Sequence, residues 1–333
     1  MTARRTTAAL VVLLLAGAAL GFVRETTVTS HPDQGRCLWW DTRTVKFKVN
    51  TTSAVNPPGG RATCANCEPC FDAAGAAALV ASTVPAWSAA TAPGGASACT
   101  DLALAYDGTT SITTLGKDGT NLVVVRTGWC FDSNLVPLSD GCRSSLGACA
   151  AKYNCWEHDS SGTLGLTTTT FDAGNGRILD ADIELFGWDG ATSGTSFGYY
   201  LTCAASPGCG RAPQQTLDKN CTYVDVASLS LHEAGHVLGL DHTCQYASPY
   251  DGCTAGSVMQ PIIPTGTTRR ALDADDVTGV CTIYPKGAAT LTCGGSSSGG
   301  GSKSGGCGSA EGAGALGLLG AALALFGVRR RRR

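Results

Sequence analysis

The chemistry of this chain concentrates in residues 232–242, which read His-Glu-Ala-Gly-His-Val-Leu-Gly-Leu-Asp-His. His232 and His236 are four residues apart, so on an α-helix both imidazoles can reach one metal ion. With His242 as a third neutral ligand, the fourth position of a tetrahedral Zn²⁺ stays open, which is typical of a catalytic site. Glu233 can then take a proton from a water on that open side. We therefore expect one catalytic zinc and a glutamate base.

A helix and the turn after it must position these groups. Asp225 or Ser228 can cap the helix. Gly239 permits the positive φ that ends it, after which the chain can double back to present His242. An ordinary core helix is the alternative, but three of the chain's only five histidines fall in this one string. The helix also has apolar positions to bury, at Val226, Leu229, Val237 and Leu238.

The string resembles the zinc-binding motif of the metzincin metallopeptidases. Residues 257–261, Ser-Val-Met-Gln-Pro, resemble the methionine turn that metzincins carry beneath the zinc. Thr243 follows the third histidine where matrixins usually have serine, and residues 272–284 resemble the matrixin closing helix with its anchoring acidic pair. Residues 164–183 resemble the segment that leads into the substrate-binding edge strand of bacterial matrixin-like enzymes, peptidases of the M10 type.

The resemblance covers about residues 37–286, and only 232–284 is strongly specific. The chain departs from the matrixin pattern between His242 and Met259, where sixteen residues include Cys244 and Cys253. We expect a disulfide between these cysteines to close the long loop. A cysteine-switch propeptide and the paired histidines of a matrixin structural zinc are missing from the sequence.

The fold that the resemblance implies is α+β, a mixed twisted sheet packed with the active-site helix. It includes a zinc cleft and a small C-terminal lobe with the methionine turn and closing helix. Alternation predicts a half-buried strand at residues 45–49, and an apolar run predicts an inner strand at 122–125. The alanine-rich segment 73–90 predicts a helix, although Pro85 weakens its middle.

Residues 179–185 alternate strictly, with Asp180, Asp182 and Glu184 on one face. We interpret this face as the solvated side of an edge strand. Calcium, which prefers such hard oxygen ligands, is the alternative occupant. A strand edge near the zinc would also hold an extended peptide through backbone hydrogen bonds.

Both termini predict export. Residues 1–22 have the charged start, short apolar run and small residues of a signal peptide. Residues 287–306 form a Gly/Ser-rich linker, and 307–333 hold a cysteine, a short apolar run and five arginines. This layout resembles MYXO-CTERM-type sorting tags, with a permanent single-span anchor as the alternative. We expect the tag to engage the membrane and the sorting machinery.

The cysteine content agrees with export. Setting Cys307 aside leaves sixteen of seventeen cysteines, enough for eight disulfides. Cys37 could in principle cap the zinc, but we favour a structural disulfide for it. Residues 64–70 have CxxCxxC spacing, for which disulfides are again favoured over a metal site. Loss of leader and tag would remove seven of 24 basic residues and one of 26 acidic residues. The acidic body that remains excludes a basic nucleic-acid surface.

These observations predict one zinc peptidase domain at residues 23–286, with cysteine-rich insertions near 127–162 and 201–221. The expected protein is an exported monomeric metalloendopeptidase, secreted or displayed on the cell surface at the outer membrane, whose substrate is a protein or peptide. Its proposed metal ligands are His232, His236 and His242, with Glu233 as the general base. The alternative is a non-catalytic binding or adhesion module on the same scaffold.

Overall fold

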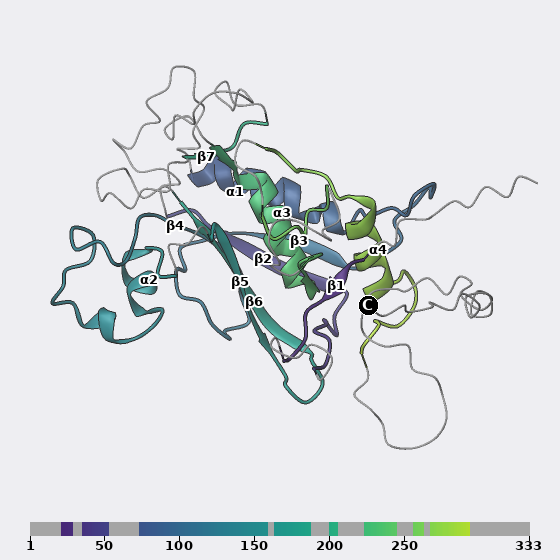
Figure 1. The fold of residues 1–333 in the computed structure, drawn as a ribbon, viewed down its shortest axis with the longest axis horizontal. Coiled ribbons are helices and arrows are strands. Elements are labelled where there is room, and N and C mark those ends of the chain that lie inside the picture. Colours follow the sequence, from purple (N-terminus) through teal and green to yellow (C-terminus); the bar gives the residue numbers. More distant parts are fainter. Residues whose placement is uncertain are drawn as a thin grey trace, which may run out of the picture.

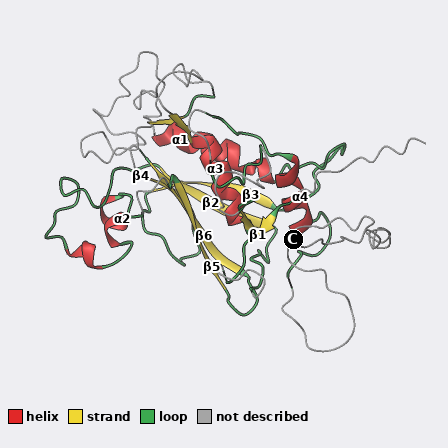
Figure 2. Ribbon diagram, in the orientation of Figure 1, coloured by secondary structure: helices red, strands yellow, loops and turns green. Residues whose placement is uncertain are grey.

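The computed structural model describes residues 21–28, 35–52, 73–158, 163–187, 200–205, 223–244, 256–262 and 267–293. A twisted five-stranded sheet lies against two long helices, with α4 beyond one end of them and a small insertion at the opposite side (Figure 1). Figure 2 shows the same arrangement by secondary structure. The fold is α+β, as predicted. The helices are α1 (Ala73–Thr83), α2 (Ala148–Tyr153), α3 (Val226–Val237) and α4 (Ala274–Ile283).

The strand order in the large sheet is β3-β2-β4-β6-β5. The first four strands run parallel, and β5 runs antiparallel to β6 at the edge. Two-stranded pairs join β1 (Val23–Arg24) to β9 (Leu240–Asp241) and β7 (Tyr200–Thr202) to β8 (Tyr223–Asp225). The strands of the large sheet are β2 (Thr44–Asn50), β3 (Ala103–Thr110), β4 (Asn121–Arg126), β5 (Gly165–Phe171) and β6 (Ile178–Phe186).

The strand predictions at 45–49, 122–125 and 179–185 are confirmed by β2, β4 and β6. The predicted helix at 73–90 begins where expected. It changes at Val84 to a short 3₁₀ turn, η2 (Val84–Trp87), because Pro85 lacks the N–H that an α-helix interior requires. The turn is useful to the fold, since it places Trp87 in the core with its Nε1 donating to Leu231 O at 2.9 Å.

The interpretation of β6 as an edge strand with a solvated acidic face is wrong. This strand lies between β4 and β5, and Asp180, Asp182 and Glu184 are all buried. Backbone N–H groups of residues 116–122 cover that face and donate to the two aspartates at 2.9–3.0 Å, while Glu184 pairs with Arg126. Apolar and acidic residues do alternate along β6, but the acidic side chains face buried hydrogen-bond donors instead of water. Among the described residues, these contacts give no support to calcium, the alternative occupant of this face.

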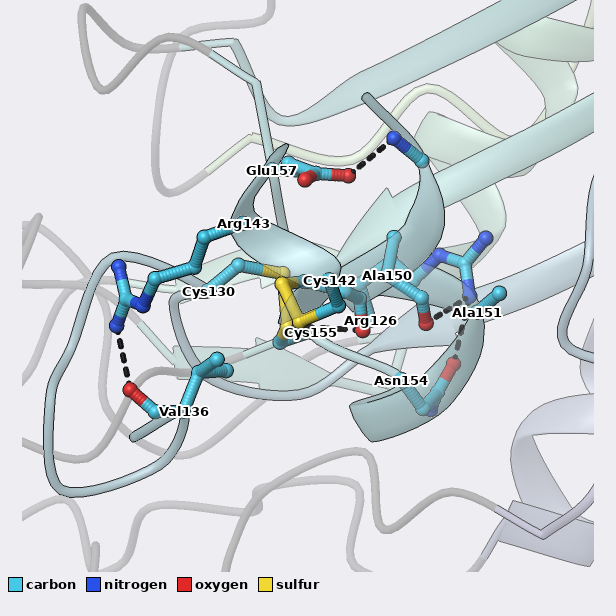
Figure 3. The surroundings of a disulfide bond; sticks show 12 residues. Arg126, Cys130, Val136, Cys142, Arg143, Ala150, Ala151, Asn154, Cys155 and Glu157 are labelled. Atoms are coloured by element: carbon cyan, nitrogen blue, oxygen red, sulfur yellow. Dashed lines mark hydrogen bonds between the residues drawn. A yellow bond between two sulfur atoms is a disulfide. The ribbon is translucent and has the colours of Figure 1, made fainter. Parts of the chain in front are cut away.

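The insertion after β4 is held by two disulfides, Cys130–Cys155 and Cys142–Cys149 (Figure 3). It contains η3 (Gly141–Ser144) and α2, and its small core is built mainly from the disulfide cysteines. Trp156 from the insertion stacks on Phe186 at the end of β6, with ring centroids 5.0 Å apart. Disulfides therefore replace part of the hydrophobic core that so short a segment cannot form.

Two further disulfides, Cys37–Cys293 and Cys99–Cys281, connect the first part of the domain to the segment that ends it. The prediction that Cys37 is structural is thereby confirmed. Cys244 is disulfide-bonded as well, but Cys253, its predicted partner, lies outside the described residues.

Several predictions fall on residues that the structure does not describe. These are most of the leader, the CxxCxxC segment, most of the 201–221 insertion, the linker from residue 294 and the C-terminal tag. Within the described ranges, none of the helices has the length and apolar character needed to cross a bilayer.

Candidate active site

Helix α3 carries the first two histidines and the glutamate, and every one of its residues is buried. Asp225 caps the helix by accepting from Ser228 N at 3.0 Å, which confirms one of the two predicted caps. Arg270 pairs with the same carboxylate. Gly235 allows close packing, because a Cβ there would lie 2.2 Å from Met259 Sδ. The helix is thus fixed at its start and from beneath.

The three predicted histidine ligands converge. The Nε2 atoms of His232 and His236 are 3.3 Å apart, and each lies 3.2 Å from His242 Nε2. Behind the rings, His232 Nδ1 lies 2.6 Å from Val258 O, and His236 Nδ1 lies 2.8 Å from Leu240 O. These carbonyls can accept only from a protonated Nδ1, so each of these two rings presents an unprotonated Nε2 to the others when neutral.

The triad has the dimensions of a zinc site. Three nitrogens bound tetrahedrally to Zn²⁺ at about 2.0–2.1 Å lie about 3.3–3.4 Å from one another, close to the observed separations. Three neutral imidazoles that directed their Nε2 lone pairs at one point would repel one another unless a cation lay between them. No other group of three metal-binding side chains occurs among the described residues. The histidines therefore fit the predicted zinc.

The turn after α3 is formed as the sequence predicts. Gly239 has φ +79°, and a Cβ there would lie 2.5 Å from Leu38 O. Glycine is thus required both for the left-handed conformation and for the close approach of the N-terminal segment. The chain then runs through β9, and Asp241 Oδ1 accepts from His242 N at 2.7 Å. This bond fixes the backbone that presents the third ligand.

Glu233 of α3 contacts the edge strand β5 through its carboxylate. Thr167 Oγ1 is 2.8 Å from Glu233 Oε2. Gly165 leaves room for the carboxylate, because a Cβ at that position would come within 2.4 Å of Glu233 Oε1. The side chain of the predicted base is therefore held by two residues of the edge strand β5.

Burial controls the ionisation of the site. It raises the pKa of Glu233, against the lowering effects of His236 and of the Thr167 hydrogen bond. Burial also lowers the pKa of His232 well below its usual value and that of His242 to about 4, assisted by the charge of His236. At His236 the penalty of burial is outweighed by contact with Glu25, which raises the pKa to about 9.

The methionine turn is confirmed in position and packing. Met259 is 2% exposed beneath the helix, and Thr243 N donates to Met259 O at 3.0 Å. Asp276 from α4 accepts from Ser257 Oγ at 2.6 Å and from Val258 N at 2.9 Å. The same carboxylate accepts from Asp273 N in a capping box that starts α4. The acidic closing segment therefore anchors the turn.

The sequence predicts all four site residues but gives no role to three residues that contact them. Gly165 and Thr167 lie in residues 164–183, which resemble the matrixin segment at the substrate-binding edge strand, and this resemblance is a signal for their contact with Glu233. Glu25, which lies 3.0 Å from His236 Nδ1, had no such signal, because a single acid shortly after an apolar leader has no diagnostic spacing.

Comparison with known families gives one match. The family model described as matrixin, a peptidase family, matches residues 162–285, from the approach to β5 to the end of α4. No curated protein matches the chain. The matched part contains the three histidines, Glu233 and the methionine turn, and its fold agrees with that of a metzincin. Residues 162–285 are thus matrixin-like, which supports a zinc metallopeptidase of the metzincin group.

Proposed function

We propose that this protein is an exported, zinc-dependent metalloendopeptidase. The observation that supports the proposal most directly is the Glu233 carboxylate, held by Thr167 beside three converging imidazoles. A structural zinc site would need a fourth protein ligand and no base. Here three ligands and a neighbouring carboxylate match the needs of hydrolysis.

The chain's own groups can carry out the reaction as follows. His232, His236 and His242 would hold Zn²⁺, which when bound polarises a scissile carbonyl and lowers the pKa of the attacking water. The Glu233 carboxylate accepts the water proton on one oxygen as the C–O bond forms. The same carboxyl group then gives that proton to the amide nitrogen as the C–N bond breaks. Thr167 keeps the carboxylate oriented through both transfers.

The edge strand β5 supplies a place for the substrate. Among the described strands it pairs only with β6, so its other side has backbone groups available to an extended peptide. A peptide that forms backbone hydrogen bonds along this edge would pass Gly165 and Thr167, which contact the base. A strand edge binds a length of extended chain on both sides of the bond to be cleaved. This arrangement favours cleavage of internal peptide bonds, which is endopeptidase activity.

The proposed location outside the cytoplasm is supported by the leader-like N-terminus, the tag-like C-terminus and the cysteine usage. Four disulfides join described residues, and such bonds persist in oxidising compartments. The destination, secretion or display at the cell surface through the C-terminal tag, is part of this proposal.

The test compares the zinc-loaded protein with Glu233→Gln. Both are incubated with a diverse peptide library, and products are identified by mass spectrometry while bound zinc is measured by elemental analysis. We expect one zinc per chain in both proteins, internal cleavage by the unmodified protein and a loss of about 10²–10⁴-fold in the variant. Zinc binding without cleavage by the unmodified protein would favour the binding-module alternative, and full activity of the variant would refute the role of Glu233.

A further inference from the structure

The N-terminal segment contributes a carboxylate to the rear of the metal site. Strand β1 pairs antiparallel with β9, the short strand that leads into His242. Immediately after β1, Glu25 N donates to Gly239 O at 3.0 Å, and Glu25 O accepts from Leu38 N at 2.9 Å. The backbone of Glu25 is therefore fixed on both sides, against the turn that follows the zinc helix.

The side chain of Glu25 reaches His236. Its Oε1 lies 3.0 Å from His236 Nδ1, the ring nitrogen opposite the one that joins the triad. The Glu25 side chain is 24% exposed and that of His236 is 10% exposed, so solvent screens this contact only partly. No other ion pair of Glu25 occurs in the described part of the chain.

The neighbouring residues hold this arrangement firmly. Arg24 donates through Nη2 to Leu38 O at 2.7 Å and through Nη1 to Leu291 O at 2.5 Å. The Cys37–Cys293 disulfide joins the same two segments. Glu25 is thus placed by contacts with distant parts of the domain and not by its local sequence.

The charge balance of the metal site favours a second carboxylate near the histidines. Three neutral imidazoles leave the full charge of a bound Zn²⁺ uncompensated, and Glu233 supplies one negative charge. His232 has a backbone carbonyl behind its ring, whereas His236 has both a carbonyl and Glu25. A carboxylate behind a metal-binding histidine fixes ring orientation and increases the electron density at the ligand nitrogen.

We propose that Glu25 is a positioning residue for the metal, which orients His236 and increases the affinity of the triad for Zn²⁺ from behind the ring. This inference rests on the zinc site of the proposed function. It extends the site beyond the helix and turn, to a residue 211 positions earlier in the chain.

The test measures zinc affinity directly. Zn²⁺ is titrated into the metal-free, disulfide-intact protein in competition with a chelator of known affinity at constant pH. The variants are Glu25→Gln, which keeps the shape but removes the charge, and Glu25→Asp, which keeps the charge on a shorter side chain. Glu157→Gln serves as a matched control, because Glu157 accepts from Gly147 N within the insertion.

We expect Glu25→Gln to bind Zn²⁺ about 10–100-fold more weakly than the unmodified protein. Glu25→Asp should recover part of that loss, and Glu157→Gln should bind as the unmodified protein does. Thermal unfolding of each metal-free variant separates affinity from folding. Unchanged affinity in Glu25→Gln, or equal losses in Glu25→Gln and Glu25→Asp, would overturn the inference while leaving the zinc site intact. Failure of the unmodified protein to bind Zn²⁺ would instead overturn the proposed function, and this inference with it.

Discussion

Thr167 Oγ1 lies 2.8 Å from Glu233 Oε2, which joins the edge strand of the sheet to the proposed base on α3. The two residues are 66 positions apart in the sequence. The same strand, β5, would therefore bind the peptide substrate and hold the Glu233 carboxylate that transfers the proton. Any shift of the strand relative to the helix would alter substrate position and base position together.

Thr167→Val should lower kcat by about tenfold or more with little change in KM, because valine has a similar shape but cannot donate to the carboxylate. The size follows from loss of a hydrogen bond to a charged group, about 1.5–3 kcal/mol. Steady-state kinetics on a cleaved library peptide would measure it. Thr168→Val, at the exposed position next to it, is the control, and equal effects in both variants would contradict the assignment.

Gly165→Ala should abolish most activity while zinc content is unchanged. The new Cβ would come within 2.4 Å of Glu233 Oε1, so the carboxylate must move away from its position. A displacement of about 1 Å in an active site can cost about 10²-fold in rate. Gly141→Ala is a suitable control, since a Cβ there meets no atom within 4 Å. Normal activity in Gly165→Ala would show that the base tolerates displacement.

Glu184→Gln should destabilise the fold by about 3–5 kcal/mol, because it leaves a buried guanidinium without its counter-charge. Arg126 Nε lies 2.6 Å from Glu184 Oε1, and both side chains are at most 2% exposed. The free energy of unfolding, from urea denaturation with disulfides intact, is the measurement. A loss below about 1 kcal/mol would mean that the neighbouring acceptors of Arg126 suffice to stabilise it.

Stability should fall as the pH rises from about 4 to 7 through Asp182. Burial raises the pKa of this carboxyl to about 7, despite the backbone donors Gly116 and Leu122. The folded state then binds more protons than the unfolded state, so the stabilisation is complete below the unfolded pKa near 3.8 and is lost as the pH passes about 7. The contribution to the slope is at most about 1.4 kcal/mol per pH unit.

Urea unfolding at pH 5 and pH 8 tests this expectation. The difference between the two pH values should be smaller in Asp182→Asn than in the unmodified protein. It should persist in Asp41→Asn, which changes an exposed acid. The same pH dependence in Asp182→Asn and in the unmodified protein would remove Asp182 as its source.

The part of the site that could be predicted from sequence is the part that depends on local spacing. His232, Glu233 and His236 lie on one helix, and Gly239 turns the chain so that His242 follows within a few residues. Main-chain geometry alone brings such groups together. The sequence also predicts Met259, because the methionine turn follows the third histidine along the chain.

Contacts between distant segments could not be predicted in this way. The alternation of β6 correctly indicated a strand, but not that residues 116–122 fold over its acidic face. A polar residue that faces buried amides and one that faces water give the same alternating pattern in the sequence. Glu25 and Thr167 likewise depend on which strands become neighbours of α3, and the sheet order decides this.

The Cys37–Cys293 disulfide closes nearly the whole described domain into one covalent ring. A protease cut at any single peptide bond between these cysteines would leave the two pieces joined, and a cut between Cys99 and Cys281 would be bridged by a second disulfide. Such a nicked molecule, including one cleaved by another copy of this protein, would migrate as one species on a non-reducing gel. Its two fragments would separate only after reduction of the disulfides. Loss of residues after Cys293 would leave the ring closed, so the disulfide-linked domain and the chain that follows it can be separated without opening the ring.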